Sequence, residues 1–279
     1  QLIEARAERE VILSGGVFNS PHLLMLSGIG DPDHLGEFGI DTKVPLKGVG
    51  KNLQDHLAVL VHYWRNDTGA FRRQMRFDRI AAAMVRAYLT GTGPATVLPG
   101  ALHGFIKTRP ELAVPDIQYF FRGVPPEADI WIPGIKPAWR DGFGLRPVLL
   151  HPESRGELRL ASADPAKRIR IIQNFLATEG DRRTLREGVK IARDLASQSA
   201  LDIHRGEERE PGSTCATDAD IDDWIRRTAM TAHHPASTCQ MGIGDDAVLD
   251  TELRVLGAES LRVVDAAAMP DLVSGNINA

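Results

Sequence analysis

The chain has 279 residues, of which 43% are hydrophobic and 25% are charged, and its formal net charge is −4. This is the composition of a folded protein with one large core or two smaller ones, and the negative charge without a basic tract argues against nucleic acid as a partner. No apolar run reaches the roughly 18 to 20 residues that a membrane-spanning helix needs, so we expect no membrane span.

The first predicted elements form an α/β unit. An apolar run, Glu-Val-Ile-Leu-Ser, ends at Gly15 and Gly16, which is typical of a buried strand followed by a turn. Ser20 is a good helix cap and Pro21 suits a first helical position, so we expect a short helix over residues 22–27.

From residue 57 onward the pattern changes to separated strands with two helices between them. The helix expected over 78–89 carries Met84 and Tyr88 on its apolar face, and the helix expected over 181–198 is preceded by Thr178 and Gly180. Both helices are expected to lie on a sheet. The expected strands cover residues 58–63, 101–107, 116–121, 146–150, 157–161 and 168–172.

The last predicted strand, residues 261–265, ends in an acid and returns the chain to the α/β layer. The first domain is therefore expected to be discontinuous and to consist of residues 1–56 and 231–279. Residues 57–230 are expected to form a second domain, an antiparallel sheet flanked by helices. The predicted fold class is thus α/β plus α+β.

Two glycine-rich stretches do not match the loops that bind nucleotides. Residues 28–30 and 48–50 each read Gly-x-Gly, the start of a GxGxxG loop. The position of the third glycine is taken by Asp33 in the first stretch and by Leu53 in the second. Neither stretch is therefore expected to bind a phosphate.

Two cysteines and a pair of histidines are candidate metal ligands. Cys215 and Cys239 cannot form a disulfide framework, which favours a reducing, cytoplasmic compartment. His233 and His234 stand near Cys239, but tetrahedral zinc needs further ligands at suitable spacing, so no metal site is expected. Taken alone, a histidine among small and apolar residues is more often structural than catalytic.

Six local patterns follow one another in a fixed order. They are VILSGGVFNSPHLLMLSGIG (11–30), GVGKNLQDH (48–56), PDIQ (115–118), HPESRGELRL (151–160), HHPASTCQMG (233–242) and LRVVDAAAMPDLVSGNINA (261–279). This order resembles that of the glucose-methanol-choline (GMC) oxidoreductases, and the first pattern is similar to the second sequence signature of that family. The family's GxGxxG loop and closing helix have no match here, so we expect a fragment that lacks both ends of the flavin domain.

The resemblance implies a Rossmann-like FAD-binding domain and a catalytic pair. In the His-Pro block of the family the histidine before the proline is the base, which is His234, whereas His233 matches a variable position. The family places histidine or asparagine at a second position that holds the alcohol oxygen, and Asn276 matches it. Read alone, Asn276 in Ser-Gly-Asn is an ordinary turn residue.

The resemblance also implies a set of cofactor contacts. The backbone after Asn276 would begin the closing helix, whose amide dipoles favour negative charge on the flavin ring. Asp55 and His56 match the family too, but a loop acid and histidine more often fix a turn, and we expect them to be structural. The residues expected at the flavin are Gly15, Gly16, Asp265, Ala266, Ile277 and Asn278.

The expected reaction is oxidation of an alcohol to an aldehyde or ketone, with proton removal by His234 and hydride transfer to flavin N5. Choline-like or primary alcohols are the expected substrates, and O₂ or a quinone is the expected electron acceptor. Phe120, Phe121 and Trp131 are candidates for an aromatic cage around a quaternary ammonium. Two alternatives remain: a flavin-containing hydroxynitrile lyase of the same family, or a non-catalytic fragment that cannot hold FAD. The sequence does not indicate an oligomeric state.

Overall fold

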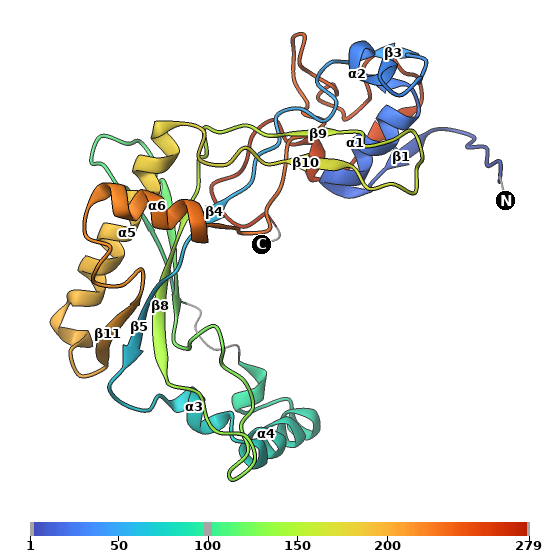
Figure 1. Ribbon diagram of the computed structural model, residues 1–279. Helices are drawn as coiled ribbons and strands as arrows, with labels where there is room; N and C mark the ends of the chain where they lie inside the picture. Colours follow the sequence, from blue (N-terminus) through green and yellow to red (C-terminus); the bar gives the residue numbers. More distant parts are fainter. Residues whose placement is uncertain (1–2, 98–101, 278–279) are drawn as a thin grey trace. The chain divides into compact units, whose positions relative to one another are not determined.

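The computed structural model describes residues 3–97 and 102–277, and these residues form two compact units (Figure 1). The first unit consists of residues 1–57, 150–181 and 231–279, and the second of residues 58–149 and 182–230. The two units differ from the expected domains at residue 57 and over residues 150–181. Residues 150–181, expected in the second domain, belong to the first, because the Leu158 N–H donates to the Gly50 carbonyl (2.7 Å) and the Leu158 side chain lies in the core of the first unit.

The first unit contains two parallel strand pairs. β1 (Val11–Leu13) pairs with β13 (Leu261–Val263), and β2 (Ile29–Gly30) pairs with β3 (Val44–Pro45). Strands β1 and β13 are therefore adjacent, although most of the chain lies between them in the sequence. The other elements of this unit are α1 (Gly16–Leu26), α2 (Pro32–Gly36), the antiparallel pair β9 (Glu157–Arg159) and β10 (Arg170–Ile172), and the short helix η3 (Ala266–Ala268).

Helix α1 begins earlier than the sequence suggested. It starts at Gly16, whose φ of +81° lies in the left-handed region, and Pro21 lies inside the helix. Pro21 has no N–H to donate to the carbonyl of Val17, four residues earlier. The Thr238 hydroxyl donates to that carbonyl instead (2.6 Å), so the proline is accommodated and α1 is attached to a distant segment.

The second unit is built on an antiparallel sheet with the strand order β11-β5-β8-β7-β6, as Figure 1 shows in part. Short strands β4 (Leu57–Ala58) and β12 (Met230–Thr231) lie where the chain passes between the units. The sheet strands are β5 (Val61–Arg65), β6 (Leu102–Ile106), β7 (Ile117–Arg122), β8 (Gly142–Leu149) and β11 (Arg205–Glu210). The expected combination of helices with an antiparallel sheet is confirmed; Ala101, in the strand expected over 101–107, lies outside the described residues.

Helix α5 (Glu179–Ser197) packs on this sheet as expected. Leu185 and Val189 are fully buried, and the Tyr119 hydroxyl of β7 donates to the Gly188 carbonyl of the helix (2.5 Å). The Thr178 hydroxyl accepts the Asp181 N–H (3.2 Å), so Thr178 caps the start of the helix. The remaining short elements of this unit are α3 (Ala70–Gln74), η1 (Pro94–Thr96), η2 (Ser199–Leu201) and α6 (Asp218–Thr228).

Helix α4 (Phe77–Thr90) forms as predicted but does not pack as predicted. None of its described residues is buried, and Met84 and Tyr88, expected to face a sheet, are 59% and 90% exposed. The regular spacing of apolar residues thus predicted the helix correctly but not the burial of its apolar face. Gly91 ends the helix with a left-handed φ of +65°.

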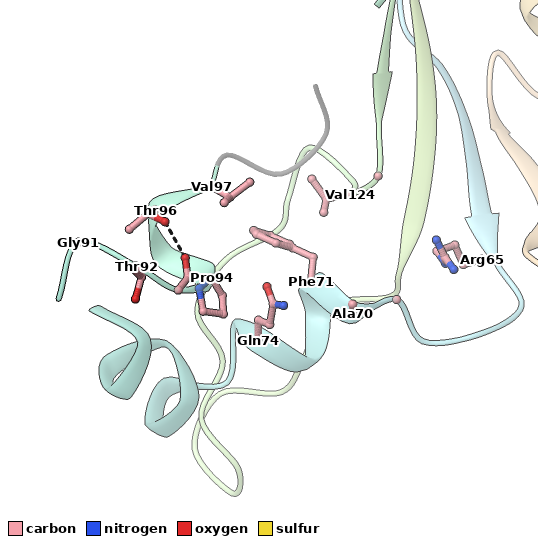
Figure 2. Close-up of a pocket in the computed structure, with 13 residues that line it drawn as sticks. Arg65, Ala70, Phe71, Gln74, Gly91, Thr92, Pro94, Thr96, Val97 and Val124 are labelled. Atoms are coloured by element: carbon pink, nitrogen blue, oxygen red, sulfur yellow. Dashed lines mark hydrogen bonds between the residues drawn. The ribbon is translucent and has the colours of Figure 1, made fainter. Parts of the chain in front are cut away.

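A cavity of about 780 Å³ opens in the second unit between α3 and the segment that follows α4. Figure 2 shows Phe71 and Gln74 of α3 on one side of it and Pro94 and Val97 on another. It contains none of the residues predicted to be catalytic. Within residues 3–97 and 102–277, no helix has both the length and the apolar character needed to cross a membrane.

Candidate active site

The site around His234 is created by pairing of two distant segments of the first unit. Gln54 and Ala236 exchange backbone hydrogen bonds in both directions (3.2 and 2.9 Å), and the Ala232 N–H donates to the His56 carbonyl (2.8 Å). These backbone hydrogen bonds place Asp55 and His56 beside His234, although His56 and His234 are 178 positions apart in the sequence. Two of the sequence patterns, GVGKNLQDH and HHPASTCQMG, therefore form one structural feature.

Asp55 holds the backbone of the histidine turn. Its carboxylate is buried, and Oδ1 accepts the His234 N–H (2.9 Å) while Oδ2 accepts the Thr231 hydroxyl. Burial raises the pKa of Asp55, and these two hydrogen bonds oppose that rise. The expected structural role of Asp55 agrees with these contacts.

His233 and His234 have different environments. His233 has a left-handed φ of +65° and is exposed, whereas the His234 side chain is 8% exposed. The change of backbone direction at His233 allows the next side chain to enter the interior. Of the two histidines, His234 is therefore the one placed in a protected site.

His56 contacts His234 directly. The two Nδ1 atoms are 2.9 Å apart, and the rings are nearly perpendicular, with an interplanar angle of 88°. His56 Nε2 lies 3.2 Å from the Leu150 carbonyl oxygen and 3.1 Å from that of Val273. Burial, with the nearby His234 as a second cause, lowers the pKa of His56 to about 4.

Asn276 lies in a loop that the same segment holds in place. The Leu272 N–H donates to the Gln54 amide oxygen (3.4 Å), and the Val273 carbonyl faces His56, three residues before Asn276. The Asn276 Oδ1 atom is buried and has no hydrogen-bond partner among the described residues. Burying an amide oxygen without a hydrogen-bond donor costs free energy of folding. The position of this atom therefore suits a polar group of a ligand.

The residues predicted at the flavin mostly come together. Asp265 accepts the Gly16 N–H (3.0 Å) and the Ser20 hydroxyl (2.5 Å) through Oδ2, and Ser20 in turn accepts the Gly15 N–H (3.0 Å). Asp265 also caps η3, which starts at Ala266. Ile277 is half-buried at the end of the described chain, and Asn278 lies outside the described residues.

Ser237 is a residue that the sequence did not single out. It has a left-handed φ of +76°, it is fully buried, and its N–H donates to the Ala266 carbonyl (3.0 Å). In the described part of the chain its hydroxyl has no partner. A strained backbone with an unsatisfied hydroxyl beside Ala266 marks Ser237 as a further candidate contact. Its only signal in the sequence is its place inside the His-Pro block.

Gly48 and Gly50 serve close packing. A Cβ atom on Gly48 would collide with the Asp246 carbonyl, and one on Gly50 would lie 2.8 Å from the Leu158 carbonyl oxygen and against Met25. Their surroundings therefore explain the glycines without a phosphate ligand.

The three aromatic residues considered as a cage do not form one. Phe120 and Phe121 are neighbours on β7, so their side chains point to opposite faces of the sheet. Phe120 packs against His103, Phe121 stacks on Phe143, and the Trp131 indole donates to the Arg72 carbonyl (2.8 Å).

Cys239 lies behind the site and is fully buried, which raises the pKa of its thiol. It is thus unsuited to act as a thiolate. Among the residues that the structure describes, no cluster of three or more His, Cys, Asp or Glu side chains could hold a metal ion.

A buried histidine lies here with its backbone held by a carboxylate, its ring beside a second histidine, and an unsatisfied amide in a loop attached to the same segment. This arrangement is suited to acid-base chemistry. Family comparison places the chain more narrowly. Residues 3–58 and 152–279 match the N-terminal and C-terminal models of the GMC oxidoreductases, and the chain belongs to this family.

By name, the similar curated proteins are choline dehydrogenases and the similar solved structures are oxidases. An oxygen-dependent choline dehydrogenase of Klebsiella pneumoniae is 38% identical over 99% of this chain and 49% of its own length, and the mitochondrial choline dehydrogenase of Mus musculus is 40% identical over 99% and 46%. A formate oxidase structure is similar with a TM-score of 0.85 and 28% identity, covering 98% of this chain and 52% of that one. Pyridoxine 4-oxidase from Mesorbium loti gives a TM-score of 0.78 and 28% identity, covering 96% and 48%. The chain thus spans about half the length of the curated relatives it matches.

Proposed function

We propose that the protein to which this chain belongs oxidises a small-molecule alcohol to an aldehyde or ketone with FAD as cofactor. The observation that carries the proposal is the arrangement of His234: it is buried, its backbone is fixed by Asp55, and its ring is held by His56. A histidine with a fixed ring is suited to take the hydroxyl proton of an alcohol.

Three features of the first unit fit a flavin. A Cβ atom on Gly16 would have no atom within 4 Å, so the backbone is open on that side. The Ser237 hydroxyl and the Asn276 amide oxygen are buried, and within the described residues both lack partners that a ligand with polar groups could supply. The Gly16 N–H already donates to the Asp265 carboxylate, so we assign Asp265 the role of holding this backbone in place. The proposed cofactor contacts are Gly15, Gly16, Ala266, Ile277 and Asn278.

The residues of the chain then have distinct tasks. His234 accepts the hydroxyl proton, and Asn276 donates a hydrogen bond from its amide nitrogen to the same oxygen, so that the charge developing on this oxygen has a partner. Asp55 keeps the histidine turn in place. A bound flavin supplies the acceptor for the hydride that leaves the alcohol carbon.

The substrate and the electron acceptor belong to the proposal as well. Choline and simple primary alcohols are the first substrates to test, because the curated relatives are named for choline. O₂ and a quinone are the two acceptors to compare.

The test is anaerobic mixing of the flavin-bound full-length protein with alcohol, followed by flavin absorbance. Bleaching of the flavin separates oxidation from lyase chemistry, in which no hydride moves. His234→Ala should slow bleaching by about 10² to 10⁴-fold, the range for loss of a general base, with flavin still bound. His233→Asn is the matched control, because asparagine tolerates the left-handed backbone at that position, and it should bleach at nearly the parent rate. Equal rates in parent and His234→Ala would exclude this role of His234.

A further inference from the structure

The hydrogen-bond partners of His56 determine where its proton lies. Its Nε2 atom faces two carbonyl oxygens, those of Leu150 (3.2 Å) and Val273 (3.1 Å), and a carbonyl oxygen can only accept. The Nε2 atom must therefore carry the hydrogen and share it between the two oxygens.

The His56 ring holds one proton only at neutral pH. It is fully buried, and its pKa is lowered to about 4, so the ring is neutral. With the single proton on Nε2, the Nδ1 atom of His56 has a lone pair and can only accept.

This assignment decides the state of His234. The two Nδ1 atoms are 2.9 Å apart, a hydrogen-bond distance, and one of them must donate. Because His56 Nδ1 accepts, the hydrogen between the rings belongs to His234. The lone pair of the neutral His234 ring is then on Nε2.

We propose that His56 is a positioning residue that selects Nε2 of His234 as the atom that takes the alcohol proton. This rests on the proposed function, in which His234 is the base. A histidine with the opposite tautomer would present an N–H to the alcohol and could not accept from it. Once Nε2 is protonated, the Nδ1–H of the charged ring still has His56 as its acceptor.

The same Nε2–H of His56 also reaches the catalytic asparagine loop. It holds the Val273 carbonyl, three residues before Asn276, while the other side of the ring holds His234. One imidazole thus orients the base and restrains the backbone that carries its partner. A purely structural role would involve only the carbonyl contacts, and this difference can be tested.

The direct test is ¹⁵N NMR of the full-length, flavin-bound protein labelled in the histidine rings. Two-bond correlations distinguish a protonated from an unprotonated ring nitrogen. We expect the His234 ring to be protonated at Nδ1 and unprotonated at Nε2, and His56 to show the reverse. A His234 ring protonated at Nε2 in the resting protein would overturn the inference, whatever the activity.

Two variants separate selection of the tautomer from structural support. His56→Asn keeps an amide at the Nδ1 position, where its oxygen can accept from His234, whereas His56→Gln places its amide at the Nε2 position, where it can donate to the two carbonyls. We expect kcat/KM to fall about tenfold or more in His56→Gln and to stay within about tenfold of the parent in His56→Asn, because turnover follows the His234 tautomer. The reverse order, with flavin bound in both, would show that His56 only supports the backbone.

The spectra also separate this inference from the proposed function. If His234 has the expected tautomer but His234→Ala bleaches the flavin as fast as the parent, the proposed function fails while the tautomer assignment stands. If the tautomer is opposite and His234→Ala is inactive, the selection role of His56 fails alone.

Discussion

A buried neutral histidine has a thermodynamic consequence for the whole protein. The pKa of His56 is lowered from its ordinary value of 6.5 to about 4, chiefly by burial and next by His234. Between these two values the unfolded chain binds a proton at this position that the folded chain does not bind. Stability therefore rises with pH across this window and is lost as the pH falls from 6.5 toward 4.

We predict that the titration of His56 lowers the free energy of unfolding by about 3 kcal/mol at most as the pH falls from 6.5 to 4. This upper bound follows from the difference between the two pKa values. The measurement is the urea midpoint at several pH values in the parent and in His56→Gln, which does not titrate. The variant should show a shallower pH dependence, and the comparison removes the contribution of Asp55, whose raised pKa acts in the opposite direction. Parallel curves for the two proteins would contradict the assignment.

The residues of the site were predictable to different degrees. His234 was found because a family block contains it, and the structure gives it the buried environment that a single sequence could not indicate. His56 was expected only to fix a turn, because the sequence does not show which nitrogen faces a carbonyl or that the residue 178 positions away is its partner. Ser237 was missed for a similar reason, since a serine in a polar block carries no sign of a left-handed backbone.

Helix α1 shows how an element can depend on a distant segment. Ser20-Pro21 reads locally as a helix start, but the helix begins at Gly16, and Ser20 donates to Asp265 instead of capping. The local pattern gave the wrong start because the hydroxyl that accommodates Pro21 comes from Thr238, more than 200 residues away.

We predict that Thr238→Val destabilises the protein by about 1 to 3 kcal/mol, since it leaves the buried Val17 carbonyl without a donor. Thr90→Val is the matched control, because the Thr90 hydroxyl donates to a carbonyl that is exposed, and its loss should have little effect. Adding Pro21→Ala to Thr238→Val should recover part of the stability, because alanine restores an N–H that can donate to Val17. Urea midpoints of the three variants measure this, and no recovery in the double variant would show that the proline is not the reason for the Thr238 contact.

Two elements of the second unit, β11 and α6, were not predicted from the sequence. β11 (Arg205–Glu210) consists almost entirely of charged residues and has no apolar alternation, so only its pairing with β5 identifies it. α6 (Asp218–Thr228) does have a recognisable start, since Thr217 and Asp220 form a capping box, and this signal was available in the sequence.

At the scale of the whole molecule, the pair β1 and β13 is an incomplete parallel sheet. Parallel strands are normally buried on both faces, yet Val11, Ile12 and Val264 are 48%, 52% and 42% exposed. The chain also spans about half the length of its curated relatives. Within the described residues, this surface therefore lacks the covering that parallel strands usually have.

We predict that residues 1–279 expressed alone hold little or no FAD, because the sheet at the proposed flavin site is incomplete. The measurement is the flavin-to-protein absorbance ratio after gel filtration, with the full-length protein as the control that retains its flavin. A ratio of one flavin per chain for residues 1–279 would contradict this expectation.

The position of β1 and β13 also has a consequence for how the protein is made. β1 finds its partner β13 only when residue 261 has been synthesised, so the first unit cannot close before then. The strands β5, β7 and β8 of the second unit can pair much sooner, because they lie within about 90 residues of one another. During translation the apolar side chains of Val11 to Leu13 remain without this partner strand until then.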